Sequence, residues 1–185
     1  MKRLYLLVFC LGFMWGCEEK KPEPVDTGEI TLSSESYGTN NYFRYGYSFE
    51  DGKFYQFPIK SSSEVPDIFL LDTPKPPENN LIGFISTETG NPNGIMKNDD
   101  FSTLAEAEEF YNSYNLALTG PWEFQSDTLE DFQVYTLRTA KNNYVKIMVL
   151  DVREIVNISP PDNIEIDIRY FIQRDGSTNL SSSGE

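Results

Sequence analysis

The chain has 185 residues, a formal net charge of −14 and no histidine, and 39% of its residues are hydrophobic. Without imidazole it has no Ser-His-Asp or Cys-His nucleophile pair and no His-ligated zinc, so the commonest routes to hydrolysis are excluded. The length suits one domain, and the strong negative charge disfavours nucleic acid as a partner.

The first sixteen residues have the pattern of a secretory signal peptide. Lys2 and Arg3 precede an apolar stretch, residues 4–15, that is too short to span a bilayer. The small residue Gly16 stands directly before Cys17, an arrangement that resembles the cleavage site of bacterial lipoproteins. We therefore expect cleavage after Gly16 and acylation of Cys17. The alternative is an ordinary secreted protein that is cut nearby.

A flexible tether, residues 17–28, is expected to precede a single β-rich domain, residues 29–185. Residues 18–28 are polar, with two prolines and no apolar period. Loss of Lys2 and Arg3 with the signal changes the formal charge from −14 to −16. The acids directly after Cys17 resemble the surface-export signal of lipoproteins in some Gram-negative groups. We expect a protein anchored in the outer membrane by its acyl chains and exposed at the cell surface.

Most of the domain shows the two-residue period of β-strands. The strands expected from this pattern are residues 42–49, 53–60, 67–72, 80–87, 133–139, 143–151 and 164–173. Asp51-Gly52 suits the turn of a hairpin between the first two. In the last strand, every second residue from Ile164 to Ile172 is apolar, so one face is expected to be buried.

A single helix is expected between the fourth and fifth strands of this pattern. Thr103 and Glu106 form a capping box, and apolar residues recur at helical spacing from Leu104 to Leu118, before Gly120-Pro121 ends the helix. Strands joined by short turns, with one helix, predict a mainly β fold with a minor α+β character: an antiparallel sheet or sandwich with one covering helix.

No sequence motif in the chain indicates an enzyme. Phosphate-binding, dinucleotide-binding and nucleophile-elbow motifs are all absent from the sequence. The many acids could supply a glycosidase-like pair only if two carboxylates faced each other within about 5 to 10 Å in a cleft. We expect a non-catalytic protein.

Several segments resemble the HmuY-like haem-binding lipoproteins. Residues 134–152 (VYTLRTAKNNYVKIMVLDV) and 166–180 (IDIRYFIQRDGSTNL) resemble the closing strands of that family, which include a strand ending in Arg-Thr-Ala. Residues 37–53 are similar to its opening strand and turn, and residues 90–107 to the Gly-rich loop and following segment of its middle. Residues 67–71 fall where the family carries a Trp-Asp-Ile-Ala-Phe stretch, with Pro66 in place of the tryptophan. The resemblance implies a mostly β fold that holds haem between finger-like loops through two axial side chains, His or Met.

On this resemblance, we expect the chain to capture haem or a similar flat tetrapyrrole and to pass it to an outer-membrane receptor. In the absence of His, the thioethers of Met96 and Met148 are the candidate axial ligands, since soft sulfur suits haem iron. Met96 is the first candidate because it falls in a Gly/Asn-rich loop. Met148 is the weaker one because it lies within a strand, where methionine usually fills the core. The second ligand of the family would fall in residues 120–133, but no residue of this segment can be assigned that role, so the second axial ligand is left open.

The alternative from another class is a non-catalytic adhesion module that binds a glycan or a protein through exposed aromatic side chains, without haem. Asp127-Thr128-Leu129 also resembles an O-glycosylation site of exported proteins in some Gram-negative lineages. Thr128 is therefore a candidate glycosylation site under either function. The oligomeric state is left open by the sequence.

Overall fold

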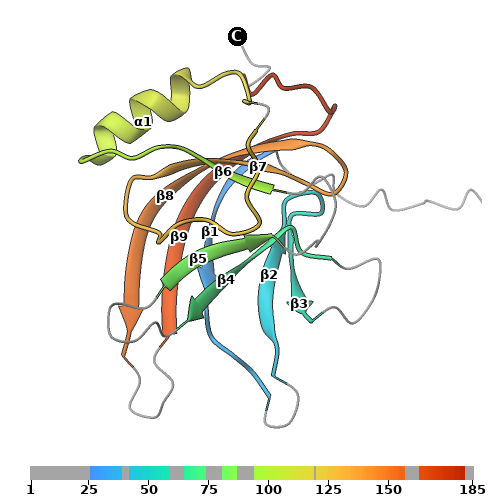
Figure 1. Cartoon of the computed structure of the whole chain (residues 1–185), viewed down its shortest axis with the longest axis vertical. Coiled ribbons are helices and arrows are strands. Elements are labelled where there is room, and N and C mark those ends of the chain that lie inside the picture. Colours follow the sequence, from blue (N-terminus) through green and yellow to red (C-terminus); the bar gives the residue numbers. More distant parts are fainter. Residues whose placement is uncertain are drawn as a thin grey trace, which may run out of the picture.

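The structure is a computed structural model that describes residues 26–38, 42–58, 65–73, 81–86, 94–118, 120–156 and 163–181. The elements in these ranges are β1 (Thr27–Ser33), β2 (Arg44–Ser48), β3 (Lys53–Phe57), β4 (Ile68–Thr73), β5 (Leu81–Ser86), β6 (Gly94–Asp99), α1 (Leu104–Ser113), β7 (Val134–Arg138), β8 (Tyr144–Ile155) and β9 (Asn163–Gln173). Figure 1 shows the strands below α1.

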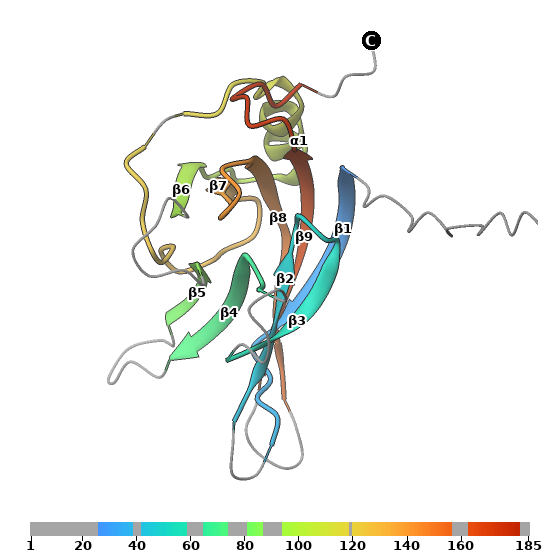
Figure 2. The ribbon, with the colours of Figure 1, turned by 90° about the vertical axis from the view of Figure 1, so that its right-hand side faces the viewer.

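The strands form two antiparallel sheets. A five-stranded sheet has the order β1-β9-β8-β7-β6, and a four-stranded sheet has the order β3-β2-β4-β5. Figure 2 shows the two sheets from the side. The predicted fold class is confirmed: the described chain is mainly β, with antiparallel sheets and one helix.

The core lies between the two sheets. One buried apolar cluster contains side chains from both, such as Leu70 of β4, Phe84 of β5 and Ile147 of β8. The hydroxyls of Tyr47 and Tyr170 form a buried hydrogen bond of 2.9 Å between the sheets. The predicted alternation in β9 is also confirmed, because every second residue from Ile164 to Ile172 is buried.

Helix α1 covers the outer face of the five-stranded sheet. Ala107 and Tyr111 are buried against Val134 and Met148. The capping box is present: the Thr103 hydroxyl accepts from the Glu106 N–H at 3.3 Å and donates to the Glu106 carboxylate at 3.0 Å. The start and the covering role of the predicted helix are therefore correct.

The end of the helix was predicted too late, because α1 stops at Ser113 rather than near Leu118. The Lys146 ammonium of β8 donates to the carbonyls of Tyr111 at 2.9 Å and Tyr114 at 3.2 Å. It therefore satisfies carbonyls that the end of a helix leaves without partners. Burial lowers the pKa of Lys146, and the same charge lies 4.7 Å from the centre of the Tyr111 ring.

Two boundaries differ from the sequence-based expectation. β1 begins at Thr27, so Thr27 and Gly28 belong to the sheet and not to the tether. β6 occupies part of the region expected to be a Gly/Asn-rich loop. The predicted signal peptide, residues 1–16, and residues 17–25 of the predicted tether lie outside the described residues.

Candidate ligand-binding site

A segment between α1 and β7 connects the edges of the two sheets. We call residues 120–127 the edge segment. It pairs with β6 through two backbone hydrogen bonds between Ile95 and Glu123, of 2.8 and 2.9 Å. It pairs with β5 through the Ser86 N–H, which donates to Phe124 at 3.0 Å, and the Ser126 N–H, which donates to Phe84 at 3.0 Å. β5 and β6 end their sheets on this side, so the edge segment covers the exposed edges of both.

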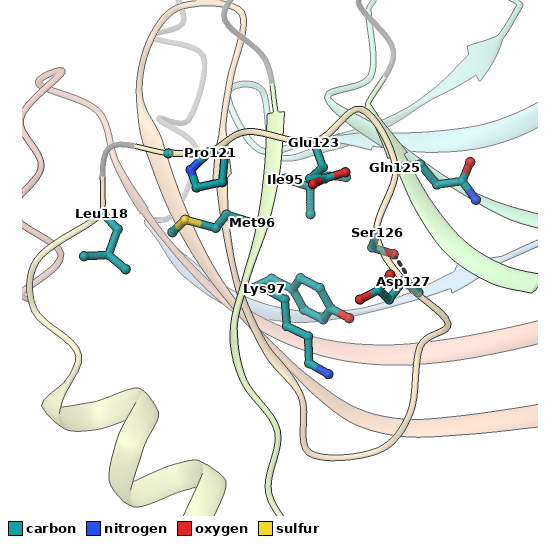
Figure 3. Close-up of a pocket in the computed structure, with 11 residues that line it drawn as sticks. Ile95, Met96, Lys97, Leu118, Pro121, Glu123, Gln125, Ser126 and Asp127 are labelled. Atoms are coloured by element: carbon teal, nitrogen blue, oxygen red, sulfur yellow. Dashed lines mark hydrogen bonds between the residues drawn. The ribbon is translucent and has the colours of Figure 1, made fainter.

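A cleft of about 370 Å³ lies where the edge segment passes β6. Its lining residues are Ile95, Met96, Lys97, Leu118, Gly120, Pro121, Glu123, Gln125, Ser126, Asp127 and Tyr135. Figure 3 shows Leu118, Met96 and Pro121 at one end of the cleft and Gln125, Ser126 and Asp127 at the other. The cleft thus has an apolar end and a polar end, and its volume falls at the low end of the range of small-molecule sites, about 300 to 1,000 Å³.

Met96 lies at the apolar end of the cleft. The expectation that it belongs to a loop is wrong, because it is part of β6 and pairs with Thr136 of β7. Ile95 on the same strand points into the core, and its side chain is 2% exposed. Neighbouring side chains on a strand point to opposite faces, so Met96 lies on the outer face, where it is 8% exposed. A strand paired with β7 therefore holds its thioether at the end of the cleft that Leu118 and Pro121 also line.

The polar end is ordered by hydrogen bonds within the protein. The Ser126 hydroxyl accepts from the Phe84 N–H at 2.9 Å and donates to the Asp127 carbonyl at 2.8 Å. The Tyr135 hydroxyl donates to the Gln133 side chain at 2.7 Å. Burial raises the pKa of Tyr135, so this hydroxyl stays protonated and remains a donor. The polar groups nearest the core therefore already have partners.

The side chains around the cleft offer one sulfur and several oxygen atoms as possible ligands. Among the described residues that line it, Met96 is the single soft donor; Glu123, Gln125 and Asp127 offer oxygen atoms. Residues 120–133, where the second ligand of the resembled family would fall, contribute no soft donor to this lining. Elsewhere in the described ranges, no group of three or more His, Cys, Asp or Glu side chains could hold a metal ion.

The other predicted site residues do not join this cleft. Met148 is fully buried beneath α1, in one cluster with Ala107, Tyr111 and Val134, so its thioether fills the core. Thr128 is exposed just after the edge segment, and its carbonyl accepts a hydrogen bond of 3.4 Å from Gln133. Cys17 lies outside the described residues.

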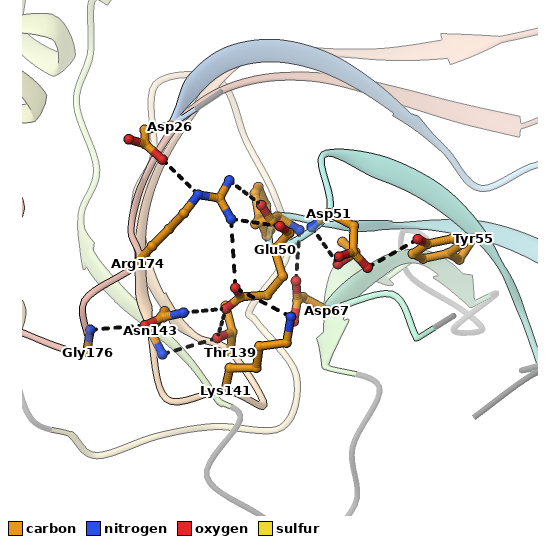
Figure 4. A network of polar contacts seen from close by, with 12 residues as sticks. Asp26, Glu50, Asp51, Tyr55, Asp67, Thr139, Lys141, Asn143, Arg174 and Gly176 are labelled. Atoms are coloured by element: carbon orange, nitrogen blue, oxygen red, sulfur yellow. Dashed lines mark hydrogen bonds and ion pairs between the residues drawn. The ribbon is translucent and has the colours of Figure 1, made fainter. Parts of the chain in front are cut away.

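A polar network lies away from the cleft, around the turn between β2 and β3 (Figure 4). The Glu50 carboxylate accepts from the Thr139 hydroxyl at 2.6 Å and from the Asn143 amide at 2.8 Å. Arg174 donates to the Asp26 carboxylate at 2.7 Å and to the Glu50 carbonyl at 2.7 Å. These bonds connect the start of β1, two turns and the segment after β9, so the network has a structural role.

Asp67 is the most deeply buried acid near this network. Its carboxylate accepts from the Phe49 N–H at 2.8 Å, and the residue is 5% exposed. Removal from water raises its pKa from 3.8 to about 7, with a further contribution from the charge of Glu50. The hydrogen bond from Phe49 acts in the opposite direction, since it favours the ionised form.

The sequence contained signals for one part of the site and for one strand away from it that the predictions missed. Residues 122–125 (Trp-Glu-Phe-Gln) alternate between aromatic and polar side chains, a pattern that indicates an extended segment. Ile30 and Leu32 show the same period in β1. β6 had no such signal, because Gly94, Asn98 and Asp99 are poor strand formers.

No described helix is both long enough and apolar enough to cross a membrane. Comparison with known proteins found no family model that matches the chain and no curated protein with significant similarity to it.

Proposed function

We propose that this chain is a lipid-anchored surface protein of the HmuY-like type, which captures haem or a similar flat tetrapyrrole in the cleft beside β6. One observation carries the proposal: the Met96 thioether lies at the apolar end of a cleft of about 370 Å³, beside Leu118 and Pro121. Haem iron accepts a thioether as an axial ligand, and apolar side chains suit a macrocycle. No catalytic step is part of the proposal.

The position of the cleft supports capture followed by transfer. The cleft lies at a sheet edge rather than in the core. Two exposed apolar side chains, Leu118 and Phe124, belong to the connection between α1 and β7, which runs along this edge. A ligand held there could leave without any opening of the core between the sheets. Such exposed apolar groups also suit contact with a partner, here an outer-membrane receptor.

The test is a titration of the apo-protein with haem, followed by the Soret absorption band. The wild type is expected to bind one haem saturably. Met96→Leu keeps the approximate volume and the apolar character of the side chain but removes the sulfur. We expect it to lose the sulfur-to-iron charge-transfer band and to bind haem at least tenfold more weakly.

Met148→Leu is the matched control, because the same change is made at a methionine buried in the core. It is expected to bind haem as the wild type does. Absence of saturable binding by the wild type would reject haem as the ligand. Equal affinity and spectra for Met96→Leu and the wild type would reject Met96 as a ligand to the iron.

The anchor is tested separately by metabolic labelling with a palmitate analogue in a Gram-negative host. We expect the label on the wild type and on Cys10→Ser, and its loss in Cys17→Ser. Cys10 is the matched control because it lies within the expected signal peptide. A label that persists in Cys17→Ser would show that this residue is not the lipidated one.

A further inference from the structure

The connection between β1 and β2 carries exposed aromatic side chains far from the cleft. Tyr37 and Phe43 pair through two backbone hydrogen bonds of 2.8 and 3.0 Å, so the described parts of this connection continue as a narrow antiparallel ladder. Figures 1 and 2 show it at the end of the molecule opposite α1. We call Tyr37, Tyr42, Phe43 and Tyr45, with the neighbouring Glu35, the aromatic tip.

Three rings of the aromatic tip support one another. The ring centres of Tyr37, Phe43 and Tyr45 lie 5.5 to 5.7 Å apart, and the Tyr45 ring meets the other two edge to face. These distances are typical of favourable aromatic pairs. The side chains nevertheless remain open to solvent: Tyr37 is 37% exposed, Tyr45 43% and Tyr42 70%. The tip is thus a supported aromatic surface that is not covered by the described chain.

Polar groups lie beside these rings. The Tyr37 hydroxyl donates to the Glu35 carboxylate at 2.6 Å, and both residues are exposed. The carboxylate has lone pairs left for further donors, because one carboxylate can accept about four hydrogen bonds. An occupant of the tip therefore meets both flat aromatic surface and a hydrogen-bond acceptor.

The size of the tip limits what can bind. A whole aromatic side chain has about 200 Å² of surface, so the exposed fractions correspond to roughly 300 Å². A stable protein interface needs about 800 Å² from each partner. The chain's charge of −14 also disfavours nucleic acid and anionic lipid. A small, uncharged ligand fits these limits better than a protein or an anion.

We propose that the aromatic tip binds an uncharged glycan, with one or two sugar rings stacked on its exposed tyrosines. The C–H face of a pyranose ring is complementary to the negative face of an aromatic ring. Sugar hydroxyls can donate to the Glu35 carboxylate. This site is separate from the cleft and does not depend on haem binding.

The test is calorimetric and NMR titration with three uncharged hexasaccharides, laminarihexaose, maltohexaose and mannohexaose. The wild type is expected to bind at least one of them. Tyr42→Ala and Tyr45→Ala should each weaken that binding at least tenfold. The matched control is Phe54→Ala, since Phe54 is a 44% exposed aromatic residue of β3 outside the tip. Phe54→Ala should change the affinity for the hexasaccharide less than twofold. Met96→Leu, a change in the separate cleft, should also change it less than twofold.

Three outcomes would overturn the proposal. The first is that none of the three hexasaccharides binds. The second is that Phe54→Ala weakens binding as much as Tyr42→Ala does. The Tyr42 side chain is too exposed to be needed for folding, so equal losses would show that the effect is not specific to the tip. The third is a dimer in sedimentation experiments that Tyr45→Ala dissociates, because the tip would then hold a second copy of the chain.

Discussion

At the scale of single residues, Asp67 shows how burial changes an ordinary acid. The side chain is held at the turn between β2 and β3 by the Phe49 N–H, yet it is almost entirely removed from water. Burial costs the charged form more than the hydrogen bonds from the Phe49 and Glu50 backbone and the Ser48 side chain return, so its pKa rises to about 7. The folded chain therefore holds a proton that the unfolded chain releases at much lower pH.

This difference predicts a pH-dependent stability. Between pH 4 and 7 the folded state binds more protons at Asp67 than the unfolded state, so this group makes stability fall as the pH rises. The slope reaches at most about 1.4 kcal/mol per pH unit. Asp67→Asn keeps an acceptor for Phe49 and has no titrating proton, so its free energy of unfolding should depend less on pH across this window.

Urea unfolding at several pH values measures this effect. Asp99→Asn, a change at an exposed acid, is the control for the loss of one negative charge. If Asp67→Asn and Asp99→Asn show the same pH profile, Asp67 does not titrate in this range.

At the scale of elements, the cleft depends on how closely the edge segment approaches β6. Gly94 makes this approach possible: a Cβ atom at this position would lie 2.5 Å from the Cβ of Trp122. The next residue, Ile95, forms the two backbone hydrogen bonds to Glu123. Trp122 itself stacks on the Arg138 guanidinium, 4.9 Å from the ring centre, so it cannot easily move aside.

Gly94→Ala is therefore expected to displace the edge segment. We predict a loss of about 1 to 3 kcal/mol in the free energy of unfolding, as for other overpacked sites. Haem affinity should fall as well, because Pro121 and Met96 would separate. In a Trp15→Phe background, fluorescence reports Trp122 alone, and its emission should shift toward the red. Unchanged stability and emission would show that the contact at Gly94 is not tight.

The elements also show what the sequence could predict. Local signals were sufficient for the start of α1, where Thr103 and Glu106 act within one turn, and for β9, where burial follows a strict alternation. The end of α1 depends on Lys146, a residue of a later strand. β6 forms because β7 and the edge segment supply its hydrogen bonds, and this pairing overrides the weak strand preference of its residues.

The candidate site was predictable only in part, because it depends on contacts between segments that are distant in the sequence. Met96 was identified by its chemistry, because few residues in a His-free chain can bind haem iron. Its neighbours Leu118 and Pro121 come from a segment about 25 residues later, and only the fold brings them together. No feature of the sequence indicated that the tyrosines of the aromatic tip would be exposed, since aromatic residues in strands more often pack in the core.

At the scale of the whole molecule, the sandwich separates two surfaces. The cleft lies at the edge where β5 and β6 meet the edge segment, and the aromatic tip lies at the end opposite α1. The network of Glu50 and Arg174 joins the start of β1 to the turns β2–β3 and β7–β8. A rigid frame with two separate surfaces could bind a glycan and a tetrapyrrole at the same time.

The central claim is that Met96 contacts the ligand captured in the cleft. Its most direct test is NMR of protein labelled with ¹³C at the methionine methyl groups, recorded with and without haem. The account predicts a large shift of the Met96 methyl signal at one equivalent of haem, while the signal of Met148, buried beneath α1, stays in place. A Met96 signal that does not move when haem is bound would contradict it.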